Sequence, residues 1–371
     1  MKKITVHLKE RSYPILVGRG FLSSVGWFLK PLKVGSKVLI VSNRRVAQYF
    51  LKPVCESLKK AGFQGFSHYL SHGDERDKSE KELLRLWSKM AQIPLDRTST
   101  VIALGGGVVG DLTAFATSTY MRGVALVQIP TTLLAQVDSA IGGKTAIDLP
   151  AAKNMVGTFY QPRMVICDIM TLNRLGLKEF RNSFAEVIKY GIIQDPPLFE
   201  LLERKADRFF SSLKRKVLGP SELTFLETIV WRSALVKSKV VERDERETKG
   251  KRMILNYGHT FAHALEGASG FKIPHGEAVA KGMILAGELA FRMGIFGKDA
   301  QARQERLIKQ VGFSGNHHFS GAQLLSFMKR DKKVRDGKLR LVLPKKIGQV
   351  GIYQVSEKEV LHVLEHGRSI R

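Results

Sequence analysis

Short apolar segments alternate with helical patterns through the first half of this chain, and this alternation limits the folds that it can adopt. The segments KVLIVS, VIAL, VALVQIP and MVICD read as strands, and helical patterns begin at about Arg45, Ser79 and Val108. Strands that alternate with helices predict a parallel sheet covered by helices. We therefore expect a Rossmann-like α/β nucleotide-binding domain over residues 1–175.

The second half of the chain has a different pattern. After about Gly176 it consists mainly of long helical patterns, followed by a late pair of strands, LRLVLP and QVGIYQV, and a terminal helix from about Glu357. A length of 371 residues suits two domains. We expect a mostly α-helical domain over residues 176–371, with helices at 178–193, 197–210, 222–242, 259–268 and 276–293.

A glycine-rich turn follows the apolar strand at residues 100–104. Gly105, Gly107 and Gly110 fit the G-x-G-x-x-G spacing, which lets backbone N–H groups approach a phosphate at a helix N-terminus. The next strand ends at Gln128 and Pro130 rather than at the acidic residue that binds a ribose hydroxyl. The turn predicts dinucleotide binding, but not in the usual Rossmann pose.

Three segments of the second half carry candidate metal ligands: Glu186 in AEVIKYG, His259 in NYGHTFAHALE and His275 in IPHGEAVAKGM. One carboxylate and two imidazoles leave open positions on a divalent ion, as a catalytic metal requires. His263 follows His259 by one helical turn, so spacing alone nominates it too. The residues between these two histidines include no glutamate, which argues against a zincin-type protease.

The charge balance is unusual, with 60 basic and 34 acidic residues and a net charge of +26. Such a balance can indicate nucleic-acid binding. The basic residues are spread along the chain, however, without a basic tail or interleaved aromatic residues, so we expect a solvated surface that attracts an anionic substrate. Cys55 and Cys167 have no C-x-x-C spacing and are expected to be free thiols. Without a membrane-spanning run or a signal-peptide pattern, we expect a cytoplasmic protein that does not enter membranes.

Eight ordered motifs together resemble the 3-dehydroquinate synthases over nearly the full length of the chain. They are GGGVVGDLTAFATSTYMRG, QIPTTLLAQVDSAIGGKTAID, KNMVGTFYQP, AEVIKYGII, VKSKVVERDERE, LNYGHTFAHALE, PHGEAVAKGM and RDKKVRDGKLRLVLP. The resemblance implies the second enzyme of the shikimate pathway, a homodimer with catalytic NAD and a zinc or cobalt ion. Its implied reaction converts 3-deoxy-D-arabino-heptulosonate 7-phosphate to 3-dehydroquinate and phosphate by transient oxidation, phosphate elimination, re-reduction and aldol closure.

The resemblance also assigns roles to single residues. It selects Glu186, His259 and His275 as the metal ligands and leaves His263 as a substrate contact near the phosphate. The other substrate residues that it implies are Arg122, Asp138, Lys144, Asn154, Lys189, Lys237, Arg252, Asn256 and Lys332, with Lys153 and Lys333 also near the phosphate. The NAD residues that it implies are Asn43, Glu75, Lys78, Gly106, Gly107, Val108, Val109, Gly110, Asp111, Thr131, Thr132, Lys144, Lys153, Thr171 and Arg174.

Some residues depart from the family pattern at the adenosine end of the NAD site. Asn43 stands where an aspartate commonly holds the ribose, and Asp74, Arg174 and Gly176 are further departures. We hypothesise a weaker ribose contact, or tolerance of a 2′-phosphate near Arg45 and Arg174.

Two related enzyme classes remain alternatives. Other sugar phosphate cyclases share the metal and NAD sites, but Arg252 and Asn256 favour a substrate with a carboxylate. Metal-dependent alcohol dehydrogenases share the architecture, but a lysine-rich phosphate pocket has no purpose in simple alcohol oxidation.

Overall fold

The computed structural model describes residues 1–149, 152–215, 218–313, 319–330, 334–335 and 338–366. The chain divides into two compact units, Met1–Leu175 with Leu223–Arg246, and Gly176–Glu222 with Glu247–Arg371. A division after Leu175 also follows from the sequence pattern. The return of residues 223–246 to the first unit differs from the single boundary that we expected, because chain order gives no sign of which sheet a later helix packs against.

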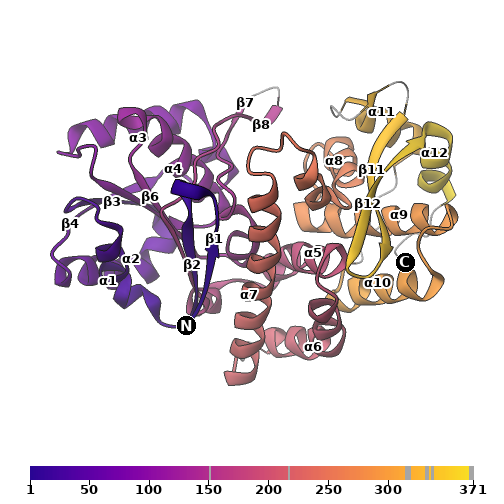
Figure 1. The fold of residues 1–371 in the computed structure, drawn as a ribbon, viewed down its shortest axis with the longest axis horizontal. Coiled ribbons are helices and arrows are strands. Elements are labelled where there is room, and N and C mark those ends of the chain that lie inside the picture. Colours follow the sequence, from indigo (N-terminus) through magenta and orange to yellow (C-terminus); the bar gives the residue numbers. More distant parts are fainter. Residues whose placement is uncertain (150–151, 216–217, 314–318, 331–333, 336–337, 367–371) are drawn as a thin grey trace. The chain divides into compact units, whose positions relative to one another are not determined.

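A seven-stranded sheet forms the centre of the first unit, with strand order β1-β2-β9-β6-β5-β3-β4 (Figure 1). β1 pairs with β2 in the antiparallel sense, and all other neighbours are parallel. The expected mostly parallel, Rossmann-like sheet is confirmed. The strands are β1 (Lys2–Val6), β2 (Tyr13–Gly18), β3 (Lys37–Asn43), β4 (Gln64–Leu70), β5 (Thr100–Gly105), β6 (Ala125–Pro130) and β9 (Met164–Asp168).

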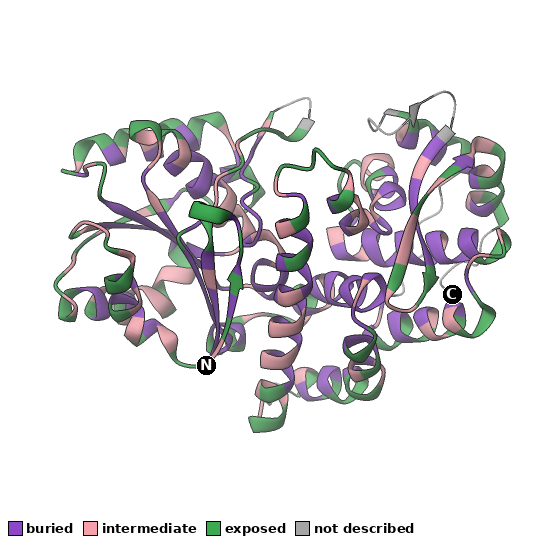
Figure 2. Ribbon diagram, viewed as in Figure 1, coloured by how far each residue is buried: buried purple, intermediate pink, exposed green. Residues whose placement is uncertain are grey.

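Helices cover both faces of this sheet, as the alternation of buried residues along β3 illustrates. Leu39 and Val41 join an apolar cluster with α3 (Glu80–Gln92) and α4 (Gly107–Thr119). Val38 and Ile40 join a second cluster with α1 (Val25–Leu29) and α2 (Arg44–Lys60). Successive side chains of a strand point to opposite faces, so a run of apolar residues is buried on both sides, as Figure 2 shows for the sheet.

The first unit also contains α7 (Pro220–Arg243) from Leu223 onward, and a short hairpin of β7 (Ile147–Leu149) and β8 (Ala152–Val156). The ammonium of Lys2 lies 4.8 Å from the ring centre of Trp231 on α7, and Glu242 accepts a hydrogen bond from the backbone N–H of His7. These contacts tie α7 to the N-terminal strands of the same unit.

The second unit is mostly helical, as expected, and is built around two largely buried helices, α5 (Leu177–Ile193) and α9 (His275–Arg292). Aromatic rings join α5 to α6 (Pro196–Lys214): the centres of Phe184 and Phe210 lie 4.7 Å apart. The other elements are α8 (His259–Ala268), α10 (Lys298–Val311), α11 (Gly321–Arg330), α12 (Glu357–His366) and the antiparallel strands β10 (Val334–Arg335), β11 (Lys338–Lys346) and β12 (Gln349–Ser356).

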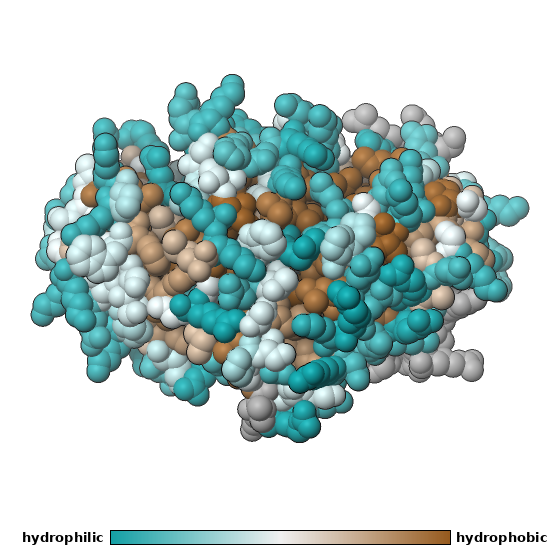
Figure 3. Space-filling model, turned by 60° about the horizontal axis from the view of Figure 1, so that its bottom comes forward, coloured by the Kyte–Doolittle hydropathy of each residue, from teal (hydrophilic) through white to brown (hydrophobic). Residues whose placement is uncertain are grey.

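The surface agrees with the strongly charged composition. Figure 3 shows hydrophilic side chains over much of the face that it presents, with hydrophobic side chains between them. Among the described residues, no helix combines the length and the apolar character needed to cross a membrane.

Candidate active site

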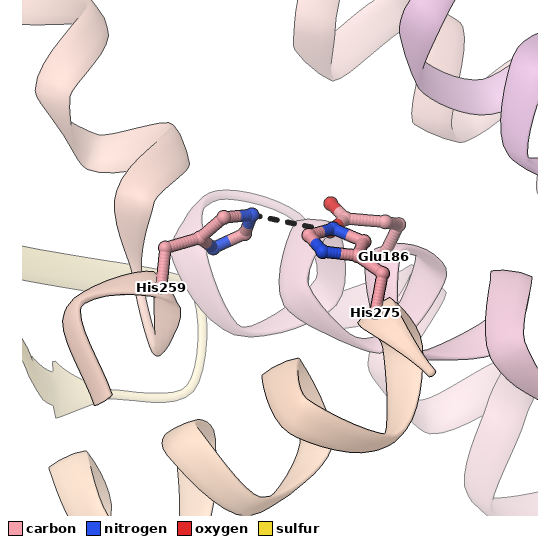
Figure 4. A group of neighbouring side chains, drawn as sticks. All are labelled: Glu186, His259 and His275. Carbon is pink, nitrogen blue, oxygen red and sulfur yellow. Dashed lines mark ion pairs between the residues drawn. The ribbon is translucent and has the colours of Figure 1, made fainter. Parts of the chain in front are cut away.

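Three helices of the second unit bring together a carboxylate and two imidazoles (Figure 4). Glu186 lies in the middle of α5, whereas His259 and His275 are the first residues of α8 and α9. One ligand atom from each of the three residues lies within 4.8 Å of the other two. The group therefore has the size of a mononuclear metal site, formed by residues far apart in the sequence.

Glycines allow the three helices to approach one another at this place. A Cβ atom on Gly282 of α9 would lie 2.0 Å from the carbonyl oxygen of Gly258, the residue before His259. A Cβ atom on Gly276 would lie 1.8 Å from the carbonyl oxygen of Asn182 on α5. No side chain larger than hydrogen fits at either position, so these glycines fix the spacing of the helices that carry the ligands.

The Glu186 carboxylate is buried among cationic and ionisable groups. The Nε2 atoms of His259 and His275 lie 3.3 and 3.4 Å from its Oε1 atom, and Lys189 forms an ion pair with its Oε2 atom. Neither carboxylate oxygen has a hydrogen bond of acceptable geometry. Buried acceptors normally have a partner, so this carboxylate suits a bound cation.

These neighbours also shift the pKa values within the group. Burial raises the pKa of Glu186, but the charge of Lys189 and the contact with His259 outweigh that effect and hold the pKa well below its usual value. Burial lowers the pKa of His259. Burial acts in the same direction on His275, but the neighbouring carboxylates of Glu186 and Glu266 raise its pKa to about 10. A neutral His259 and an ionised Glu186 are the forms that bind metals.

His263, the alternative ligand by spacing, lies outside this group. Its side chain is exposed, and its ring centre lies 5.8 Å from that of His259. Two other candidates, Arg252 and Asn256, lie on the 3-10 helix η8 (Lys251–Asn256), which leads directly into His259. The Arg252 side chain is only 2% exposed, and its Nε atom lies 3.4 Å from Glu247.

A cavity of about 460 Å³ lies within the first unit. Lys237 of α7 lines it and forms an ion pair with Asp138 at 2.8 Å. The ammonium of Lys78 lies 2.9 Å from Asp111 and also contacts Asn154. The predicted residues that line the cavity are Asp111, Asp138, Lys144, Asn154 and Lys237.

The glycine turn leads into α4, whose N-cap is Gly106. No side chain caps this helix end, so its first N–H groups lack a capping partner, as a helix end that binds an anion requires. Cβ atoms on Gly106 and Gly107 would approach Thr132 and Ser139 at 3.1 and 3.2 Å. Burial raises the pKa of Asp111, and Lys78 opposes that shift.

The remaining predicted residues of the first unit lie outside the cavity lining. Asn43 caps α2 by accepting a hydrogen bond from Val46 N at 2.9 Å, and the buried Thr171 donates to the Asp168 carbonyl at 2.8 Å. Arg174 lies over the ring of Tyr49. Arg122 and Lys153 are exposed. Glu75, Thr131 and Thr132 also lie outside the cavity lining. Lys332 and Lys333 lie outside the described residues.

Sequence reasoning assigned no role to two groups that contact the histidines. The Glu266 carboxylate lies 3.1 Å from Nδ1 of His275, and the Tyr257 carbonyl lies 3.1 Å from Nδ1 of His259. Glu266 belongs to the motif LNYGHTFAHALE, but only the packing of α8 against α9 reveals its partner.

Known proteins match the chain along its length. Residues 68–182 match the family described as 3-dehydroquinate synthase N-terminal, and residues 183–334 match 3-dehydroquinate synthase C-terminal. The chain belongs to the 3-dehydroquinate synthase family. The 3-dehydroquinate synthase of Rippkaea orientalis is 44% identical over 368 residues, covering 98% of each chain. That of Desulforamulus reducens is also 44% identical over 368 residues, covering 98% of this chain and 99% of the relative.

A solved structure supports the fold. The 2-epi-5-epi-valiolone synthase from Streptomyces hygroscopicus subsp. jinggangensis, determined with NAD+ and Zn2+ bound, has a TM-score of 0.83 and 25% identity, covering 95% of this chain and 96% of that chain. Membership of the 3-dehydroquinate synthase family confirms the predicted family and the prediction that the chain is an enzyme.

Proposed function

We propose that this chain converts 3-deoxy-D-arabino-heptulosonate 7-phosphate to 3-dehydroquinate and inorganic phosphate, with NAD and one divalent metal ion as cofactors. The observation that carries the proposal is the group formed by Glu186, His259 and His275, in a chain of the 3-dehydroquinate synthase family. The same proposal includes a homodimer, which rests on the resemblance to the family, and a cytoplasmic location, which rests on the sequence pattern.

The donor set of this group fits zinc or cobalt. One carboxylate oxygen and two imidazole nitrogens are the ligands of many catalytic zinc sites, which keep a further position open for substrate. The buried Glu186 oxygens, which accept no hydrogen bond of acceptable geometry, support this assignment, because a bound metal ion would coordinate them. Glu186, His259 and His275 would hold the ion.

The first unit offers a matching site for NAD. The glycine turn allows close approach of a pyrophosphate to the N-terminus of α4, a helix of 13 residues. Gly106, Gly107, Val108, Val109, Gly110 and Asp111 would hold the pyrophosphate, with Thr131, Thr132, Lys144 and Lys153 toward the nicotinamide. Asn43, Glu75, Lys78, Thr171 and Arg174 would bind the adenosine part.

When bound, the metal supplies Lewis acidity to the substrate oxygens and NAD supplies a transient hydride acceptor. The side chains of the protein bind and orient the substrate around this chemistry. The buried Arg252 offers a fixed positive charge to the substrate carboxylate, aided by Asn256. Lys189 and Asp138 would position the substrate hydroxyl groups next to the metal.

Cationic side chains would hold the phosphate group. Arg122, Lys153 and Asn154 would bind it together with His263 and Lys332, while Lys144 and Lys237 would contact hydroxyl or carboxylate oxygens. The proton at C6 passes to the leaving phosphate as the C–O bond breaks, so the elimination balances without a separate protein base. After re-reduction, the protein only has to hold the intermediate in the orientation that favours ring opening and aldol closure.

The proposed function is tested by identifying the product. The purified protein, loaded with zinc or cobalt, is incubated with the heptulosonate phosphate and NAD, and the product is identified by NMR. Formation of 3-dehydroquinate supports the proposal, and glucose 6-phosphate, which lacks the carboxylate, should not be converted. Conversion of glucose 6-phosphate instead would assign the chain to another sugar phosphate cyclase activity.

Two variants separate the site from general stability. His275→Ala removes one proposed ligand and should abolish product formation. Glu203→Ala removes a partly buried carboxylate of the same unit, which pairs with Arg303 at 2.6 Å, and should retain it. Full activity of His275→Ala would contradict the proposed ligand set.

A further inference from the structure

Glu266 lies on α8 two helical turns after His259, on the same face of the helix. Its side chain is 15% exposed, and its Oε1 atom lies 3.1 Å from Nδ1 of His275, the first residue of α9. One helix therefore carries a proposed metal ligand and, seven residues later, a carboxylate that contacts a second proposed ligand.

Both histidines are held at Nδ1 and present Nε2 to Glu186. His259 has the Tyr257 carbonyl at Nδ1, and its Nε2 atom lies 3.3 Å from Glu186. His275 has Glu266 at Nδ1, and its Nε2 atom lies 3.4 Å from the same oxygen. A partner that accepts a hydrogen bond at Nδ1 places the proton there and leaves the Nε2 lone pair for a metal.

The two outer partners differ in kind. A backbone carbonyl orients the His259 ring, whose side chain is only 12% exposed and is also held by packing. The His275 side chain is 36% exposed, so its neighbours constrain it less. A carboxylate accepts a stronger hydrogen bond than a neutral carbonyl and makes the imidazole a more basic ligand. Ring orientation at His275 therefore depends on Glu266 more than on packing.

Charge gives Glu266 a second effect. The group holds the cation Lys189 in contact with Glu186, so a divalent ion would enter beside an existing positive charge. The negative charge of Glu266, on the far side of the His275 ring, favours the cation, because two opposite charges attract strongly where little water intervenes.

We propose that Glu266 is a positioning residue of the metal centre, which orients His275 through Nδ1 and raises the affinity of the site for its divalent ion. The residue does not touch the metal or the substrate; it acts through the imidazole of His275. This inference rests on the ligand set in the proposed function, and on no step of the proposed reaction.

The test compares metal affinity among variants of the full chain. The metal is removed with a chelator, and the dissociation constant for Zn²⁺ is measured by competition with a chromophoric chelator. Glu266→Ala should weaken binding by about 10- to 100-fold, the usual effect of losing an outer partner of a metal-bound histidine. Glu266→Gln keeps an acceptor oxygen but loses the charge, so its affinity should lie between those of Glu266→Ala and the unchanged protein.

A matched control distinguishes positioning from a general loss of stability. Glu203→Ala removes a carboxylate from a partly buried ion pair with Arg303 in the same unit, and should leave Zn²⁺ affinity unchanged. The absorption spectrum of bound Co²⁺ provides a second measurement, because it reports ligand geometry. We expect an altered spectrum in Glu266→Ala and a nearly unchanged one in Glu266→Gln.

The outcomes separate this inference from the proposed function. Zn²⁺ affinity within twofold of the unchanged protein in every folded Glu266 variant would overturn the inference, and Glu266→Gln serves if Glu266→Ala does not fold. A lack of turnover with the heptulosonate phosphate would refute the proposed reaction but leave this comparison valid. A lack of Zn²⁺ binding by the unchanged protein would refute the ligand set and the inference together.

Discussion

The ammonium of Lys237 lies 2.8 Å from the carboxylate of Asp138 and donates to the Asp138 backbone carbonyl at 2.7 Å. Lys237 is on α7, and Asp138 lies in the π-helical turn η6 (Ala135–Ser139), 99 residues earlier. Both side chains line the cavity of the first unit. The pair thus fixes α7 to the unit that carries the glycine turn, and it holds the carboxylate at the cavity wall.

Replacement of Lys237 by methionine should reduce both stability and activity. The buried end of the side chain loses its charge, and Asp138 loses a partner, which costs about 1–3 kcal/mol in the free energy of unfolding. Chemical denaturation and turnover measure the two effects. Lys239→Met, an exposed lysine on the same helix, should change stability by less than about 0.5 kcal/mol. Equal stability of both variants would contradict the role of this pair.

Replacement of Gly282 by alanine should separate α8 from α9. Because the new Cβ atom would lie 2.0 Å from the Gly258 carbonyl oxygen, one helix must move, and such overpacking costs about 1–3 kcal/mol. The shift should also weaken Zn²⁺ binding, since the two helices carry His275 and His259. Gly297→Ala is the control, because a Cβ atom there meets nothing within 4 Å. Melting temperature and Zn²⁺ affinity provide the test, and unchanged values for Gly282→Ala would refute the argument.

Sequence patterns predicted most of the fold because periodic burial is a local property. The helix His259–Ala268 has the expected bounds. The helix α10 was not expected, because polar residues such as Gln301 and Gln304 occupy its buried face. Gln304 accepts a hydrogen bond from the buried Tyr257 hydroxyl at 2.7 Å, so tertiary contacts compensate for its polarity.

The candidate site could be predicted from sequence only in part. Family motifs nominated Glu186, His259 and His275, whereas helical spacing alone also nominated His263. Spacing could not decide, because the third residue comes from the start of another helix, α9, and its approach depends on glycines that contact neighbouring backbone. The contact of Glu266 with His275 depends on the same packing and has no periodic signal in the sequence.

Metal binding should depend strongly on pH. Carboxylate contacts raise the pKa of His275 to about 10, so at neutral pH the metal-free ring carries a proton that a metal must displace. The affinity for the metal therefore rises with pH below about 10, by about tenfold per pH unit if one proton is displaced. Calorimetry in buffers of different ionisation enthalpy measures the released proton. A metal affinity that does not change between pH 6 and 8, within experimental error, would contradict this linkage.

Asn43 should influence the choice between NAD and NADP. It ends β3 and caps α2, whose first turn contains Arg44 and Arg45 and no acidic residue. Aspartate caps a helix equally well, but its carboxylate accepts a hydrogen bond from a ribose 2′-hydroxyl and repels a 2′-phosphate. Asn43→Asp should therefore lower NADP affinity relative to NAD by about tenfold, measured by calorimetry with each cofactor. An unchanged affinity ratio would show that Asn43 does not contact this part of the cofactor.

The most direct test of the proposed activity is to count phosphate released per NAD molecule. The metal-loaded protein is mixed with excess heptulosonate phosphate and a small amount of NAD, and phosphate and NADH absorbance are followed together. The proposed reaction returns each hydride within one turnover, so we expect many phosphates per NAD without accumulation of NADH. Stoichiometric NADH with little phosphate would identify a dehydrogenase and contradict the central claim.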